Sequence, residues 1–122
     1  ELAERLEHLD ASFSEALLAL IDERGLTDAQ VYRRANLSRQ LFSKIRSRPD
    51  YRPSKPTAVA LALTLGLTLP QTQELLAHAG LTLSRSSKFD VIVEFYVARG
   101  VYDIFRINEA LFAYDEQLLG SI

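Results

Sequence analysis

The chain has 122 residues, of which 48% are hydrophobic and 25% are charged, and it is long enough to bury one hydrophobic core. It has no cysteine, which excludes disulfide bonds and thiolate metal sites, and its longest apolar stretch, residues 58–69, is too short and too interrupted to cross a bilayer. No secretory signal opens the sequence, so we expect a cytoplasmic protein without a membrane span. The first residue, Glu1, and the lack of methionine indicate a piece of a longer or processed chain.

The first 23 residues allow two interpretations. Apolar residues recur there at alternating spacings of four and three, which predicts one continuous amphipathic helix. However, Ser12 followed three residues later by Glu15 forms a capping box, which would begin a new helix at Phe13 and leave residues 1–11 as a linking helix. In both interpretations Gly25 ends the helix.

Turn chemistry predicts two short helices between residues 27 and 46. Thr27 and Gln30 form a second capping box, which begins a helix that extends to about residue 35. Asn36 occupies a turn position that favours a positive φ angle, and Ser38 then caps a helix over residues 38–46. The segment 47–55 is polar and basic and contains prolines, so it is predicted to be a loop.

Two helices follow this loop, over residues 57–65 and 68–79, and each ends at a glycine. Beyond a serine-rich linker, Ser87 and Asp90 form a further capping box, and Asp103 caps a last helix. No stretch of strand length alternates between apolar and polar residues.

These elements predict an all-α fold of about seven helices. Residues 1–81 would form a five-helix unit, and residues 82–122 would form a C-terminal helical extension. Because two helices alone bury little surface, we expect this pair to pack on the five-helix unit or on a partner.

Basic residues are concentrated in one segment of an otherwise acidic chain. The net charge is −2, but residues 33–56 hold one acidic and eight basic side chains: Arg33, Arg34, Arg39, Lys44, Arg46, Arg48, Arg52 and Lys55. A concentrated basic block of this kind favours binding of a polyanion, because phosphate neutralisation depends on local charge. The alternative is an ordinary solvated surface.

The same segment has the packing residues of two helices that cross over a four-residue turn. A small residue precedes the turn, an aliphatic residue fills it, and an apolar pair three residues apart seats the second helix on the first; the inward residues are Val31, Ala35, Leu37, Phe42 and Ile45. With its flanking helices, the region 13–80 resembles the Xre/Cro family of phage-repressor-like helix-turn-helix proteins. It departs from the family pattern at Tyr32, where a small residue is usual, at Arg46, where an acidic residue is common, and in a longer loop.

The resemblance implies a transcriptional regulator that binds double-stranded DNA as a homodimer, with helix 38–46 in the major groove. Its outward residues would then read base edges: Arg39, Gln40, Ser43 and Lys44. Basic side chains around it would contact phosphates: Arg33, Arg34, Arg46, Arg48, Arg52 and Lys55. The helix N-termini at Thr27 and Thr57 would add backbone N–H groups, and Leu41 would either touch a thymine methyl or pack against the loop.

Five aromatic residues near the C-terminus belong either to the core or to a surface for a partner: Tyr96, Tyr102, Phe105, Phe112 and Tyr114. A partner surface would favour a second hypothesis, a helical protein-interaction or tethering module of a larger bacterial protein with the helix-turn-helix as scaffold. We predict no catalytic constellation and no cofactor. We also predict no metal site, because His8 and His78 lack a ligand spacing.

Overall fold

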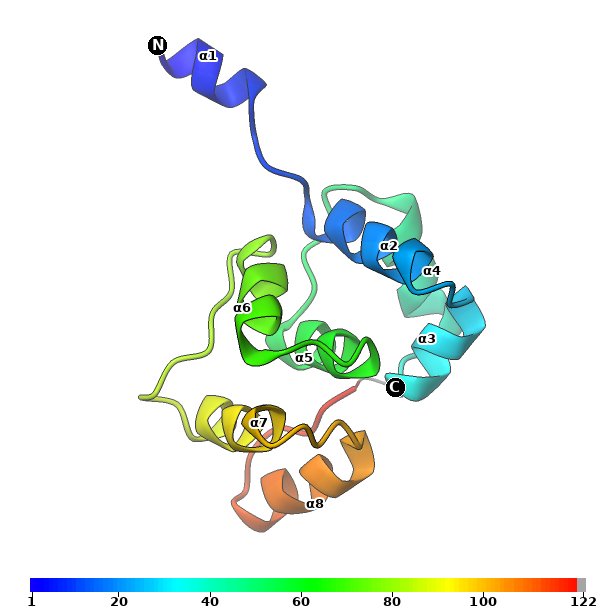
Figure 1. Ribbon diagram of the computed structural model, residues 1–122, viewed down its shortest axis with the longest axis vertical. Helices are drawn as coiled ribbons and strands as arrows, with labels where there is room; N and C mark the ends of the chain where they lie inside the picture. The colour runs from blue at the N-terminus through cyan, green and yellow to red at the C-terminus, as the bar shows by residue number, and fades with distance from the viewer. Residues whose placement is uncertain (121–122) are drawn as a thin grey trace.

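The computed structural model describes residues 1–120, which form eight helices and no strand (Figure 1), so the all-α fold class is confirmed. The helices are α1 (Leu2–Glu7), α2 (Phe13–Glu23), α3 (Asp28–Arg34), α4 (Arg39–Ser47), α5 (Lys55–Thr64), α6 (Leu69–Ala77), α7 (Lys88–Ala98) and α8 (Ile104–Ala113). Within residues 1–120, no helix has both the length and the apolarity needed to cross a membrane.

The chain breaks between α1 and α2, so the continuous N-terminal helix is wrong and the capping box at Ser12 is confirmed. The Glu15 N–H donates to Ser12 Oγ at 3.2 Å, and Glu15 Oε1 accepts from the Ser12 N–H at 2.9 Å. Each of these two backbone N–H groups, which would otherwise lack an acceptor, therefore donates to the side chain of the other residue. As a result α1 stands apart from the other helices (Figure 1).

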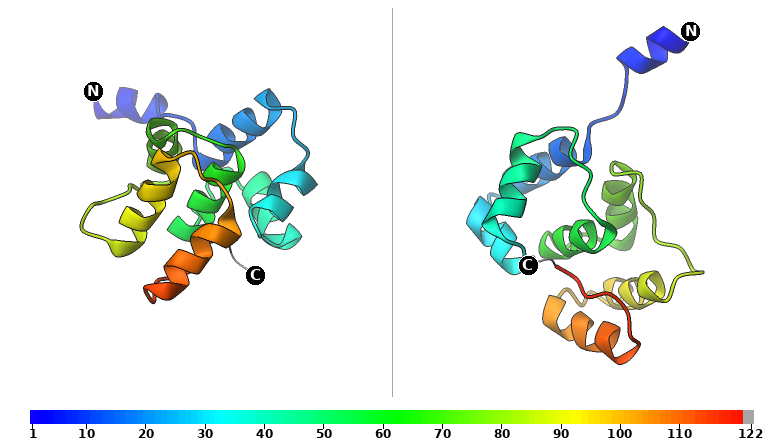
Figure 2. Two further views of the ribbon diagram at one scale, coloured as in Figure 1. Left: turned by 60° about the horizontal axis from the view of Figure 1, so that its bottom comes forward. Right: turned by 180° about the vertical axis from the view of Figure 1, so that it is seen from behind.

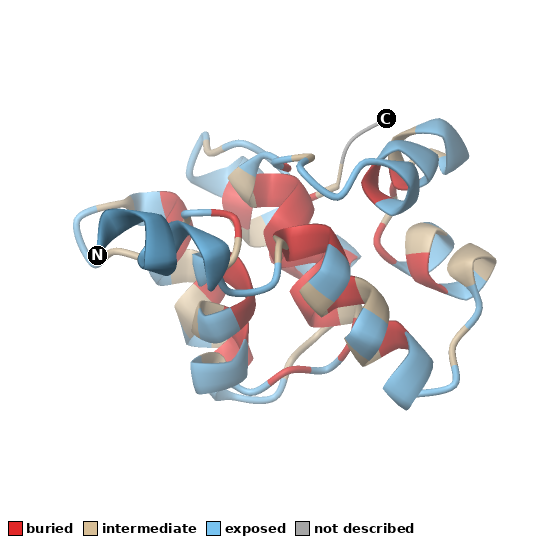
Figure 3. Cartoon of the chain, turned by 90° about the horizontal axis from the view of Figure 1, so that it is seen from above, coloured by how far each residue is buried: buried red, intermediate tan, exposed pale blue. Residues whose placement is uncertain are grey.

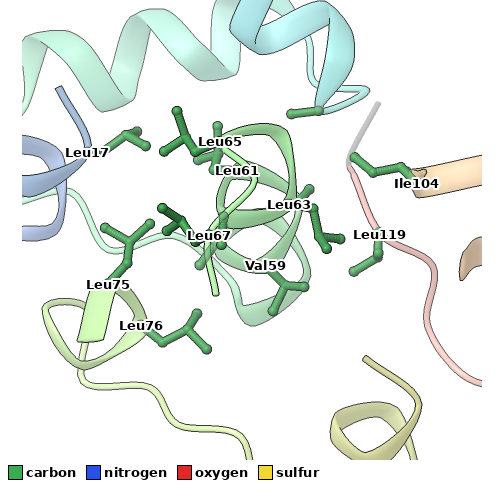
Figure 4. Close-up of a cluster of buried hydrophobic side chains, with 14 of the residues drawn as sticks. Leu17, Val59, Leu61, Leu63, Leu65, Leu67, Leu75, Leu76, Ile104 and Leu119 are labelled. Atoms are coloured by element: carbon green, nitrogen blue, oxygen red, sulfur yellow. The ribbon is translucent and has the colours of Figure 1, made fainter. Parts of the chain in front are cut away.

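Helix α5 lies at the centre of the fold and begins two residues earlier than predicted. Ser54 caps it in place of Thr57, because the Thr57 N–H donates to Ser54 Oγ at 3.4 Å. Pro56 stands in the first turn, where its missing N–H has no intrahelical partner to lose. Every residue of α5 from Pro56 to Leu63 is buried. Figure 4 shows the helix surrounded by side chains from both halves of the sequence: Leu17, Leu75, Leu76, Ile104 and Leu119.

The C-terminal pair α7 and α8 shares this core. Helix α7 packs on α6, α8 packs on α7, and one continuous cluster of buried side chains runs from Phe13 to Leu119. The buried side chains of α7 and α8 are Phe89, Asp90, Val93, Val97, Ile104, Ile107 and Leu111. The aromatic residues Phe105 and Phe112 of α8 are instead exposed, at 69% and 75%.

The segment after α8 returns to the helix-turn-helix region (Figure 2). The Asn108 side chain fixes it, because Asn108 Oδ1 accepts from the Leu119 N–H at 2.7 Å and Asn108 Nδ2 donates to the Leu119 carbonyl at 3.2 Å. Leu119 is fully buried, and the backbone of Gly120 lies against Asn36 so closely that an added Cβ would stand 2.9 Å from the Asn36 carbonyl oxygen. The tail thus packs against the turn between α3 and α4.

Candidate nucleic-acid interface

The turn between α3 and α4 has the predicted geometry. Asn36 adopts φ 57°, a conformation that Asn tolerates better than most residues. The Leu37 N–H then donates to the Tyr32 carbonyl at 2.8 Å, and Leu37 is buried beneath the turn. Ser38 caps α4, since its Oγ accepts from the Leu41 N–H at 3.0 Å. These local bonds fix the direction in which α4 leaves the turn.

Helix α4 has one buried side and one exposed side. Phe42 and Ile45 are buried against the core, and Leu41 is half-buried, packed against the same core. The opposite side carries the four residues predicted to read bases, all of them exposed: Arg39, Gln40, Ser43 and Lys44. Position 43 is four residues from position 39 and three from position 40, and position 44 is four residues from position 40, so these side chains share one helical face. We call these four residues the reading face.

The bulky residue Tyr32 fits into the helix crossing without entering the core. It is half-buried, and its ring lies against that of Phe42 with centroids 6.0 Å apart and planes tilted by 44°. The Arg33 guanidinium lies over the Tyr32 ring at 6.0 Å. The Tyr32 ring thus packs on Phe42, the buried residue of α4, and helps to fix the position of this helix.

The basic side chains around α4 divide into two groups. Arg46 and Lys55 form ion pairs, whereas the other six basic side chains of residues 33–56 form none with the described part of the chain: Arg33, Arg34, Arg39, Lys44, Arg48 and Arg52. All six are exposed. Arg33 and Arg34 lie at or near the end of α3, and Arg48 directly follows α4, so positive charge borders α4 at both ends. Arg52 lies farther along the loop, where its guanidinium approaches Gly80 beyond the end of α6.

Arg46 is bonded to Asp28 rather than left free for a phosphate. Its Nε donates to Asp28 Oδ2 at 2.7 Å and its Nη2 donates to Oδ1 at 2.6 Å, a bidentate arrangement between α4 and the first residue of α3. These hydrogen bonds raise the pKa of Arg46. The basic residue that departs from the family pattern therefore joins the two helices of the motif.

Lys55, another predicted phosphate contact, is likewise engaged. Its Nζ donates to Asp90 Oδ2 at 2.9 Å, and the same oxygen accepts from the Ser84 N–H at 2.7 Å. Asp90 is buried, and its second oxygen, Oδ1, has no hydrogen-bond partner among the described residues. The predicted capping box of α7 is therefore only half formed, because Ser87 accepts from the Asp90 N–H while the carboxylate turns inward.

The sequence contained a signal for the burial of Asp90. Asp90 precedes Val93 and Val97 by three and seven residues, which places it on the buried side of α7. The capping pattern with Ser87 offered a local role for Asp90, so its helical position on the buried side was overlooked.

Two helix N-termini, at Thr27 and Thr57, were predicted to contact phosphates, and the structure has only one of the two helices begin there. Thr27 begins α3 with a complete capping box, as predicted. Thr57 is buried inside α5, so the phosphate contact predicted there is wrong and the exposed start of this helix is at Ser54.

The chain was compared with protein families, curated proteins and solved structures. No family model matches the chain, and neither curated proteins nor solved structures gave a match. The resemblance to the Xre/Cro family therefore depends on the sequence pattern of residues 13–80 alone.

Proposed function

We propose that the chain is a sequence-preferring DNA-binding module of a transcriptional regulator, with α4 in the major groove. The observation that carries this proposal is the reading face, whose Arg39, Gln40, Ser43 and Lys44 are exposed on a helix held from behind by Phe42 and Ile45. Arg is suited to guanine O6 and N7, and Gln to adenine N6 and N7. In this proposal the module acts as a homodimer, because two symmetric half-sites make up for the small contact area of one helix.

The distribution of charge supports phosphate contacts at both ends of α4. Arg33 and Arg34 lie at the end of α3, Arg48 and Arg52 lie in the loop after α4, and all four are exposed. Arg46 and Lys55 are left out of this set because carboxylates already neutralise them. The proposed phosphate contacts are therefore fewer than the local charge of residues 33–56 suggests.

Salt dependence of binding to a fluorescently labelled random-sequence duplex tests this assignment. Four phosphate contacts for each bound chain predict that log K falls against log salt with a slope of about −3.5 for one chain and about −7 for a homodimer. A flat plot, or no binding at low salt, would contradict the proposal. The charge-reversal variant Arg48→Glu should reduce the slope, whereas the matched change Arg106→Glu, at an exposed position on α8, should leave it unchanged.

A second candidate function has an observation of its own. Phe105, Phe112 and Tyr114 are each more than half exposed, so this part of the aromatic set is a surface and not core. Exposed aromatic groups at this density favour a protein-interaction module. A chain that binds no duplex at low salt but retains a protein partner through these residues would support this candidate over DNA binding.

A further inference from the structure

Helix α1 has an apolar side with nothing against it. Leu2, Leu6 and Leu9 are 70%, 60% and 75% exposed, and all ten residues from Glu1 to Asp10 are exposed (Figure 3). Leu2 and Leu6, four residues apart, lie on one side of α1, and Leu9 follows two residues after the helix ends; we call these three residues the leucine stripe. A helix of six residues is far below the length of about 12 to 15 residues at which isolated helices become marginally stable. The leucine stripe therefore requires a surface to pack against.

An apolar groove with an open mouth lies between α7 and α8. It has a volume of about 610 Å³, and its apolar lining comprises Val91, Ile92, Phe95, Tyr96, Ala110 and Tyr114. Its walls are held in place, because Phe95 and Tyr96 meet edge to face at 5.2 Å and the Arg99 guanidinium lies 3.5 Å above the Phe95 ring. Val91 and Phe95 remain nearly half exposed. We call this surface the α7–α8 groove.

The leucine stripe and the groove carry opposite charge. Two cations and no anion line the described groove, Arg85 and Lys88, both exposed. Arg85 Nη2 lies 3.7 Å from Glu94 Oε1, so Lys88 is the one of the two that forms no ion pair with the described residues. Around the leucine stripe, four carboxylates outnumber one arginine: Glu1, Glu4, Glu7 and Asp10 against Arg5. Opposite potentials of this kind favour one partner over others and steer the encounter.

The two surfaces belong to opposite ends of one molecule. Figure 1 places α1 at one end of the longest axis and α7 with α8 at the other, with α5 and α6 between them. The segment between α1 and α2 is short and is anchored near its end. His78 Nδ1 lies 2.7 Å from the Ala11 carbonyl oxygen, and this contact holds the segment at the end of α6. From Glu7 to Ala11 an extended chain spans at most about 14 Å. The same copy of the chain therefore cannot wrap α1 around α5 and α6.

We propose that α1 of one copy docks its leucine stripe into the α7–α8 groove of a second copy, and that the second copy returns the same contact. Two chains placed side by side in opposite directions make both contacts at once, which closes the dimer without exposing a further groove. This inference specifies the interface of the homodimer in the proposed function. It is tested without DNA, so its failure and the failure of DNA binding are distinguishable.

Sedimentation equilibrium of the whole chain over a wide range of concentrations tests the contact. Leu6→Glu places a charge in the leucine stripe, and Val91→Glu places a charge in the groove. Both residues are exposed, so the circular dichroism spectrum and the melting temperature should stay close to those of the unsubstituted chain. Each change should raise the dimer dissociation constant at least about a hundred-fold, since each symmetric dimer loses two apolar contacts. Leu118→Glu, an exposed apolar position outside the groove, should leave dimerisation unchanged.

Mixing the two variants separates this arrangement from other dimers. A Leu6→Glu chain has an intact groove and a Val91→Glu chain has an intact stripe, so the mixture should form a heterodimer more tightly than either variant forms a homodimer. Pairing of α1 with α1 would spare Val91→Glu, and pairing of groove with groove would spare Leu6→Glu. A monomer at all concentrations, a dimer unaffected by either change, or a mixture without heterodimer would each overturn the proposal.

The absence of cysteine allows a direct check of proximity. Chains carrying Leu6→Cys and Val91→Cys should form a disulfide-linked heterodimer under mild oxidation. Chains carrying Leu6→Cys and Leu118→Cys serve as the control and should link far more slowly. Equal rates for the two pairs would contradict docking of α1 in the groove.

Discussion

Lys55 Nζ donates a hydrogen bond to Asp90 Oδ2 over 2.9 Å, and this ion pair joins the start of α5 to α7 across 35 residues of sequence. The carboxylate is buried, whereas the Lys55 side chain is 29% exposed. The same carboxylate oxygen holds the Ser84 N–H in the connection that leads into α7. Asp90 therefore attaches α7 to the start of α5, the central helix of the fold.

Removal of this carboxylate should destabilise the whole fold. We expect Asp90→Ala to lower the free energy of unfolding by about 2 to 3 kcal/mol, because it leaves a half-buried ammonium group and the Ser84 N–H without an acceptor. Urea denaturation measures the change. The exposed substitution Glu109→Ala on α8 is the control, and a loss at Asp90 no larger than the control's would show that the ion pair does not hold the helices together.

Gly120 should tolerate a methyl group worse than a glycine of similar conformation. Gly120 and Gly100 have φ angles of +81° and +69°, but a Cβ on Gly120 would stand 2.9 Å from the Asn36 carbonyl oxygen, whereas a Cβ on Gly100 would meet nothing within 4 Å. Gly100→Ala should therefore cost about 1 kcal/mol for the backbone conformation alone, and Gly120→Ala should cost about 1 to 2 kcal/mol more. Equal losses in thermal denaturation would mean that the tail does not press on the turn in solution.

The capping box at Ser12 should give the protein a stability term that disappears in acid. The Ser12 backbone N–H, and to a lesser extent its side chain, hold the pKa of Glu15 below its ordinary value of 4.5. A pKa that is lowered on folding stabilises the protein above pH 4.5, and this contribution is lost as the pH falls through the lowered pKa. Glu15→Gln keeps a capping side chain but has no charge to titrate. The stability difference between the two chains should be present at pH 7 and should shrink on acidification below about pH 4.5; a difference independent of pH would contradict this.

Arg46 and Arg48 should differ in their contribution to DNA binding. Asp28 neutralises Arg46, whereas Arg48 at the end of α4 forms no ion pair with the described residues. Arg48→Gln should reduce the salt slope of duplex binding by about 1, and Arg46→Gln should leave the slope nearly unchanged. If Arg46→Gln weakened binding as strongly as Arg48→Gln, the Asp28 pair would not persist on DNA.

Features set by neighbouring residues could be predicted from the sequence. The capping boxes at Ser12 and Thr27 join groups three residues apart, and the positive φ of Asn36 follows from the turn that contains it. The residue pattern is sufficient where no other group competes for the side chain. It failed at Ser87, because the Asp90 carboxylate bonds to Lys55 and Ser84 instead. The outward direction of the reading face follows in the same way from the helical spacing of Phe42 and Ile45.

Features that join distant segments could not be predicted. The partner of Lys55 lies 35 residues away, and Arg46 meets Asp28 across a helix crossing, so neither pair can be read from local spacing. Arg46 and Lys55, which were predicted to contact phosphates, therefore pair with carboxylates instead. The return of Leu119 to the core also depends on Asn108, whose side chain fits the tail only once α8 is in place.

Selection of bound fragments from a random duplex library tests the central claim most directly. The chain is compared with a variant carrying Arg39→Ala, Gln40→Ala and Lys44→Ala, all exposed positions that leave the packing of Phe42 and Ile45 intact. If α4 reads the major groove, the unsubstituted chain should enrich a defined motif and the variant should lose it, with each lost bidentate contact relaxing discrimination by about 1 to 3 kcal/mol. Enrichment of no motif by the unsubstituted chain, or of the same motif by both chains, would contradict the account.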